Sequence, residues 1–312
     1  DGGKVEVKSL GRLIMEHKEK GDLRVGAMPF MIPFDVKTLF QTTVGWAPQA
    51  IRIPRVELYP SRPIAVVDFI PQLPTNQNAI VYMEETTATF NAAEKAEAAA
   101  YAESAFALTQ RSDEVEKITT SLPVTDEQLD DIEGAEAYIN QRLTYDIQRR
   151  LDLQVLEGDG ATPNLLGTLN KGSIQSQALG NDPVPDAIYK CFDLIRTAGF
   201  AEPDVLFINP NDWQPVRLLR TADGIYIWGS PQEAGPDRIW GKTVLQTTAV
   251  TANTALCGAY SQYSALYVKA GLEISVGYVN DDFTKGKKTL RGQMRCSMVH
   301  FRPSAFGKIT GI

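Results

Sequence analysis

The sequence predicts an α+β fold in which an N-terminal arm, a long β-hairpin, a long helix and an α/β module follow one another along 312 residues. Three observations carry this prediction. Residues 80–118 contain two alternating segments, which is typical of paired strands. Residues 125–158 carry apolar side chains at helical spacing, bounded by start and stop signals. Residues 186–275 alternate between short apolar runs and amphipathic helical patterns, as an α/β module does.

Residues 1–55 are predicted to form an extended arm, because glycine and proline interrupt every regular pattern in it. A short helical face of Leu10, Leu13, Ile14 and His17 is the exception, and it ends at Gly21. The basic residues of the arm are interspersed with acidic ones. This mixture favours a solvated charged arm over a nucleic-acid contact.

Strands are predicted for Val56 to Tyr59 and for Ile64 to Ile70, where apolar and other residues alternate. The hairpin of residues 80–118 contains a conflict, because Ala92 to Ala107 has high helical propensity but no wide apolar stripe. We therefore favour a hairpin with a mobile tip, part of which can be helical. A charge pair between Glu85 and Arg111 is expected across its strands.

The long helix is predicted to begin with a capping box of Thr125 and Gln128 and to stop at Gly158. Gly134 is a soft break near its start. One stripe of this helix is apolar, at Leu129, Ile132, Ile139, Leu143, Ile147, Leu151 and Val155. Because this helix is polar on much of its circumference, we expect it to span a flat molecule and not to form the centre of a compact core.

The module of residues 186–275 is predicted to begin with a helix that Asp186 caps and Gly199 ends. A strand from Val205 to Ile208 and a helix opened by Asn209-Pro210 and running to about Leu219 follow. Further strands are expected at Ile225 to Trp228, around Val244 and Leu256, at Leu266 to Val268, and at Leu272 to Val276. The tail from Met294 to Ile312 alternates again.

Composition excludes several classes of protein. The net charge of −7 argues against a dedicated nucleic-acid binder, which needs concentrated lysine and arginine. No apolar run approaches 18 residues, so no membrane span is predicted, and no signal peptide opens the chain. Cys191, Cys257 and Cys296 are far apart and odd in number, which predicts buried free thiols in a reducing compartment.

No group of residues assembles a predicted active site, cofactor site or metal site. His300 lies in a strand-like run and is expected to be structural, as is His17 in the arm. Glu157-Gly158-Asp159-Gly160 is interpreted as a tight turn, because no regular series of oxygen ligands follows it. No phosphate-binding glycine motif is present. The remaining candidates are interpreted as a solvated loop (Lys285, Lys287, Lys288) and as core or interface anchors (Trp213, Trp228, Trp240).

Short motifs run in one order from about Arg55 to the end of the sequence. They are Ala102-Glu103-Ser104, Pro123-Val124-Thr125-Asp126, Tyr138-Ile139-Asn140 with Arg142-Leu143, Glu157-Gly158-Asp159-Gly160, Asn164-Leu165 with Gly167 and Leu169-Asn170, Asn209-Pro210 with Asp212-Trp213, Tyr226-Ile227 with Gly229, and His300-Phe301-Arg302-Pro303. Together with the order of arm, hairpin, helix and module, they resemble the major capsid proteins of tailed bacteriophages, which have the Hong Kong 97-like fold.

The resemblance implies how the parts are organised. Residues 56–79, 119–185 and 276–312 would form a peripheral domain with the long helix as its spine. Residues 80–118 would be the extended loop that reaches over a neighbouring subunit, and residues 186–275 the axial domain that meets its copies at the capsomer centre. Residues 1–55 would be the N-terminal arm.

The resemblance also implies a function and partners. The chain would not be an enzyme. It would assemble in the host cytoplasm into pentamers and hexamers of an icosahedral shell, the virion capsid, around double-stranded DNA bound without sequence specificity. A portal, a decoration protein and a maturation protease acting on the precursor are the further partners considered. Asp1 in place of Met fits a clipped leader and equally a cloning boundary.

Some of these shells form an isopeptide bond between a lysine and an asparagine, assisted by a glutamate. The corresponding positions here are Tyr101, Gly286 and Gln293, so the resemblance implies no autocatalytic crosslink. Lys95 lies in the same loop but has no placed glutamate to accept its proton.

Two alternatives remain at the level of sequence. An encapsulin-like nanocompartment shares the fold and holds cargo enzymes in place of a genome. A soluble oligomeric enzyme would use Glu157, Asp159 and His300, and it predicts that these three lie together in one pocket.

Overall fold

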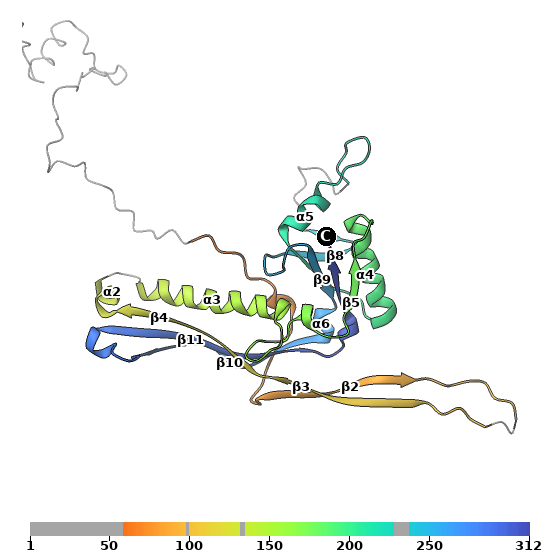
Figure 1. Cartoon of the computed structure of the whole chain (residues 1–312), viewed down its shortest axis with the longest axis horizontal. Coiled ribbons are helices and arrows are strands. Elements are labelled where there is room, and N and C mark those ends of the chain that lie inside the picture. The colour runs from red at the N-terminus through yellow and green to blue at the C-terminus, as the bar shows by residue number, and fades with distance from the viewer. Residues whose placement is uncertain (1–58, 98–99, 132–134, 228–236) are drawn as a thin grey trace, which may run out of the picture. The chain divides into compact units, whose positions relative to one another are not determined.

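The computed structural model describes residues 59–97, 100–131, 135–227 and 237–312 (Figure 1). The chain divides into the units Asp1–Tyr59 and Pro60–Ile312, and all elements described here belong to the second. The predicted arm, its short helix, the strand at residues 56–58, Gly134 and Trp228 lie outside the described residues. None of the described helices is long and apolar enough to cross a bilayer.

A four-stranded sheet supports the long helix. Its strand order is β1 (Gln72–Pro74), β10 (Ser264–Gly277), β11 (Lys287–His300) and β4 (Glu116–Thr125), with β1 parallel to β10 and the other pairs antiparallel. Helix α3 (Ala135–Glu157) lies along β4 and β11 (Figure 1). Ile139 and Leu143 pack there against Val124 and Leu290. The absence of a side chain at Gly292 leaves room for Ile147, because a Cβ would lie 2.8 Å from its Cδ1.

The start and end of the long helical region are as predicted. Short helix α2 (Asp126–Asp131) opens with the capping box, in which Thr125 Oγ1 accepts from the Gln128 amide at 3.3 Å. The Gln128 side chain in turn accepts from the Thr125 amide at 3.5 Å. Helix α3 ends at Glu157, directly before Gly158.

The hairpin is confirmed. Strands β2 (Ala79–Thr89) and β3 (Ala105–Glu114) pair only with each other, and the described residues between them contain no helix. Residues 116–118, which the sequence placed in the hairpin, belong to β4 and pair with β11. The pairing of Glu85 with Arg111 is wrong. The register places Tyr82 opposite Arg111, and Glu84, two residues further along β2, lies on the same face of the hairpin. Arg111 Nε therefore pairs with Glu84 Oε2, at 2.7 Å.

The α/β module is built on a six-stranded sheet. Its strand order is β5 (Gln175–Ala178), β12 (Phe306–Thr310), β9 (Thr254–Gly258), β6 (Val205–Ile208), β8 (Lys242–Gln246) and β7 (Arg238–Ile239). Helix α4 (Val184–Gly199) packs on β5, β9 and β12, while α5 (Pro210–Arg217) follows β6 and α6 (Tyr260–Tyr263) precedes β10. The core includes edge-to-face contacts of Tyr260 with Phe207 and with Phe306, each with ring centroids 5.0 Å apart.

Four local expectations are wrong. Ile64 to Ile70 contains the 3₁₀ helix η1 (Val67–Phe69) in place of a strand. Asp186 does not cap α4, because the helix begins at Val184 after Pro183. At residues 225–227 there is a single bridge between Arg220 and Tyr226 followed by a turn. The strands expected at 266–268 and 272–276 are one strand, β10, interrupted by register shifts.

The three cysteines are buried and unbridged, as predicted. The Sγ atoms of Cys191 and Cys257 lie 3.2 Å apart in the core of the module. Burial raises the pKa of Cys257, and it raises that of Cys296 to about 12. The thiols of Cys257 and Cys296 are therefore poor nucleophiles.

Candidate functional site

The hairpin carries an exposed apolar stripe. Register places Val81, Met83, Phe106 and Leu108 on one face, and the ring of Phe90 meets that of Phe106 at 5.6 Å. These five side chains are 56% to 77% exposed. A two-stranded hairpin is only marginally stable by itself in water, so this element requires a partner surface.

A polar cluster holds the base of the hairpin. Tyr82 of β2 donates from its hydroxyl to the His300 carbonyl at 3.2 Å, and its ring meets Phe301 edge-on at 5.5 Å. Lys171 Nζ lies 3.4 Å from the Tyr82 hydroxyl and 3.9 Å from Asp113 Oδ2. Burial raises the pKa of Asp113 despite the opposing charge of Lys171. Burial also raises the pKa of Tyr82, with a further contribution from Asp113.

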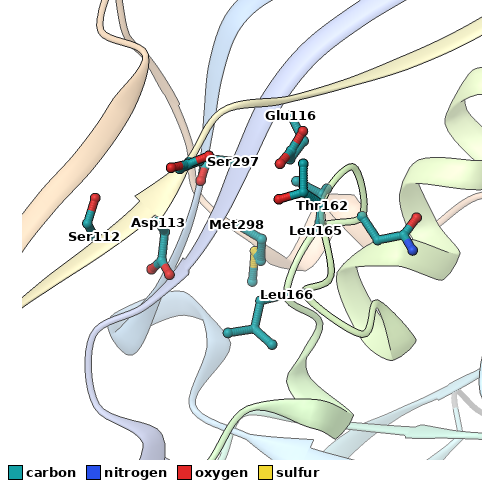
Figure 2. Close-up of a pocket in the computed structure, with 11 residues that line it drawn as sticks. Ser112, Asp113, Glu116, Thr162, Leu165, Leu166, Ser297 and Met298 are labelled. Atoms are coloured by element: carbon teal, nitrogen blue, oxygen red, sulfur yellow. The ribbon is translucent and has the colours of Figure 1, made fainter.

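A polar cavity of about 310 Å³ lies beside this cluster (Figure 2). Asp113 of β3 lines it from the hairpin, Glu116 from β4, Ser297 from β11, and Thr162 and Leu166 from the loop after α3. No cluster of three metal-ligating side chains occurs among the described residues, here or elsewhere.

The residues of the enzyme hypothesis do not meet in this cavity. Asp159 Oδ1 accepts from the Ala161 amide and from Asn164 Nδ2, each at 3.0 Å, and these bonds lower its pKa. Glu157 accepts from the amide of Thr251. Glu157 is the last residue of α3, and Asp159 lies in the tight turn predicted after it, where it forms a bridge with Leu166.

His300 is a structural residue, as predicted. It is fully buried at the end of β11, and Nε2 lies 2.9 Å from Thr168 Oγ1. Burial, and secondarily the charge of Lys171, lower its pKa to about 3. An imidazole that stays neutral and enclosed at neutral pH has no access to a substrate.

The structure describes the three positions that the resemblance assigns to the crosslink. Tyr101 is 89% exposed in the hairpin tip. Gly286 has φ +58° and no neighbouring atom within 4 Å of where its Cβ would be. Gln293 donates to Glu273 at 3.2 Å. A phenol, a glycine and an amide cannot replace an amine, an asparagine and a general base.

The tryptophans differ in their surroundings. Trp213 is 2% exposed and belongs to the core of the module. Trp240 is 49% exposed, with its ring 5.0 Å from that of Tyr189.

One interaction on α3 was missed from the sequence. The segment before η1 lies along this helix, where Tyr145 donates to the Arg62 carbonyl at 3.1 Å and Arg62 donates to the Arg149 carbonyl at 2.8 Å. The Asp152 carboxylate, fully buried, faces Arg62 and the backbone amides of residues 65–67. One sequence signal could have revealed this contact: Asp152 is an acidic residue directly after Leu151, which belongs to the apolar stripe of the helix.

Comparisons with known proteins agree with this geometry. The model of the phage capsid family matches residues 61–311. The major capsid protein of Enterobacteria phage HK97 is 28% identical over 265 residues, which cover 84% of this chain and 69% of that protein.

Solved structures also match. The capsid of a native GTA particle has a TM-score of 0.68 at 17% identity, with 85% of this chain and 94% of that chain covered. The structure from Microbacterium phage Oxtober96 has a TM-score of 0.66 at 17% identity, with 84% and 95% covered. The likeness extends to the fold, which is Hong Kong 97-like, and the chain belongs to the phage capsid family.

Proposed function

We propose that this protein is the major capsid protein of a virion, the repeating subunit of an icosahedral shell of pentamers and hexamers around double-stranded DNA. The exposed hairpin carries this proposal. Its apolar stripe and its two unpaired strand edges have no partner surface among the described residues, and a second copy supplies one in a shell. The relatives reported above, which are phage and GTA capsids, support a viral shell over a cargo compartment or an enzyme.

The roles of the parts belong to the same proposal. Residues 56–79, 119–185 and 276–312 form the peripheral domain, residues 80–118 the extended loop, and residues 186–275 the axial domain. A portal, a decoration protein and a maturation protease are the expected partners of such a shell.

Electron microscopy and light scattering of the complete gene product test the proposal. Closed shells of megadalton mass are expected. A stable monomer or small oligomer under all assembly conditions would contradict it, while shells filled with protein cargo would favour the compartment.

We further propose that the shell is held without autocatalytic covalent bonds, because Tyr101, Gly286 and Gln293 supply none of the required groups. Denaturing electrophoresis of purified particles is expected to give the subunit as a single monomer band. A ladder of multimers that survives boiling in detergent and reductant would refute this.

A further inference from the structure

Two of the three cysteines meet in the core of the α/β module. Cys191 comes from α4 and Cys257 from β9, 66 residues further along the chain, and their Sγ atoms lie 3.2 Å apart. Both side chains are fully buried. Cys296, the third cysteine of the sequence, lies on β11 in the other sheet. The fold thus brings together one particular pair of thiols.

A glycine opposite Cys257 makes room for the two sulfurs. The register of β12 against β9 places Gly307 directly opposite Cys257. A Cβ at Gly307 would lie 2.5 Å from the Sγ of Cys191 and 3.3 Å from that of Cys257. Any larger residue at this position of β12 would therefore displace the sulfur of Cys191, so the contact between the two thiols depends on the glycine.

The pair is close to the geometry of a disulfide. Such a bond is about 2.05 Å long, so the two sulfurs have to approach each other by about 1.2 Å. A small rotation about χ1 of each cysteine supplies this shift. Helix α4 already packs against β9, so neither element has to move to form the bond.

We propose that Cys191 and Cys257 are a modification site, at which hydrogen peroxide converts the two thiols into a disulfide that ties α4 to β9. Peroxide oxidises one thiol to a sulfenic acid and releases water; the second thiol then attacks that sulfur, and a second water leaves. Two electrons pass from the two sulfurs to the peroxide, and both thiol protons end in water. Peroxide suits this site because it is hardly larger than water, whereas full burial excludes a bulky oxidant such as oxidised glutathione.

The surroundings of the pair make the reaction slow. Burial raises the pKa of Cys257, so little of it is thiolate, which is the reactive form. The pair therefore stays as two thiols in a reducing compartment and closes in an oxidising medium. One consequence alone rests on the proposed function: shells would assemble from the thiol form inside the host and acquire the bond after release.

Peroxide treatment of the folded, unassembled complete gene product tests the proposal. Mass spectrometry of the intact chain is expected to show the loss of two hydrogens. A digest made without reductant should contain one linked pair of peptides, carrying Cys191 and Cys257. The bond closes a loop of 66 residues, so the midpoint of thermal unfolding should rise by about 8 °C and return to its starting value after reduction.

Two variants form a matched pair of controls. Cys257→Ala removes one sulfur of the pair, and Cys296→Ala removes the buried thiol outside it. Each variant is compared with its own untreated sample, so any loss of stability from the substitution itself cancels. Only Cys296→Ala should retain the rise in the unfolding midpoint after peroxide.

Three results would overturn the inference. The first is three intact thiols in the folded chain after a treatment that oxidises the same cysteines in the urea-unfolded chain. The second is a bond that includes Cys296 or joins two chains, and the third is a gain of oxygen at Cys191 or Cys257 in place of the bond. None of these readouts depends on assembly, so a chain that forms the bond but no shells keeps the inference and loses the proposed function.

Discussion

Acid should destabilise the folded subunit through His300. This imidazole is fully buried, and Nδ1 has no hydrogen-bond partner among the described residues, so a second proton would enter a site without an acceptor for it. Its pKa falls from the usual 6.5 to about 3, through burial first and the charge of Lys171 second. The test lowers the pH from 7 to 5 and compares the loss of unfolding free energy in the wild type with that in His300→Gln.

The sign follows from proton linkage. Below pH 6.5 the unfolded chain binds a proton at His300, whereas the folded chain binds it only near pH 3, so stability falls as the pH falls between these values. At about 1.4 kcal/mol per pH unit, this residue alone removes about 2 kcal/mol of unfolding free energy between pH 7 and pH 5. Asp113 and Asp152, whose pKa values burial raises, act in the opposite direction in both proteins.

Urea unfolding of unassembled subunits, followed by tryptophan fluorescence, measures the effect. His300→Gln is expected to be less stable than the wild type at pH 7, because the packing against Phe306 changes. Its loss of stability on acidification should nevertheless be smaller by about 2 kcal/mol. Equal pH dependence in the two proteins would show that His300 is already accessible to protons, and the reasoning would be refuted.

Three further substitutions test the packing around the site. Lys171→Met should lower the unfolding free energy by about 2 kcal/mol because the partly buried Asp113 carboxylate loses its cation 3.9 Å away, and adding Asp113→Asn should recover most of this; additive losses in thermal unfolding would contradict the coupling. Asn209→Ala should cost about 1 kcal/mol in urea unfolding, because the capping bond of 3.1 Å at the start of α5 is lost; an unchanged midpoint would speak against it. Gly199→Ala should abolish soluble folded protein, since its Cβ would lie 2.4 Å from a backbone oxygen of η4, whereas Gly172→Ala, with no atom within 4 Å, should express normally.

Local signals account for the elements that were predicted. Thr125 and Gln128 cap a helix by contacts within four residues, and the glycine at 158 marks the end of α3. A Cβ at Gly158 would lie 2.1 Å from the backbone oxygen of Leu165, so the following loop also requires a glycine there. For Ala92 to Ala107 the sequence favours a hairpin in place of a helix. The segment has high helical propensity but no apolar stripe, so a helix there would have no surface to pack against.

Long-range contacts account for what was missed. The segment at Ile64 to Ile70 alternates like a strand, but the buried carboxylate of Asp152 faces its backbone amides and it forms η1. The candidate site is thus visible from the sequence as a hairpin, but its anchoring by Tyr82, Lys171 and Asp113 is not.

The position of β12 makes the six-stranded sheet depend on the part of the chain that is synthesised late. It follows all the other described strands in the sequence, yet it lies between β5 and β9 and pairs with both. A chain that stops before residue 306 lacks the piece that joins β5 to the rest of its sheet, and it leaves Tyr260 without the ring of Phe306. A chain truncated before β12 is therefore expected to fail to complete its six-stranded sheet, and such copies should be missing from assembled particles.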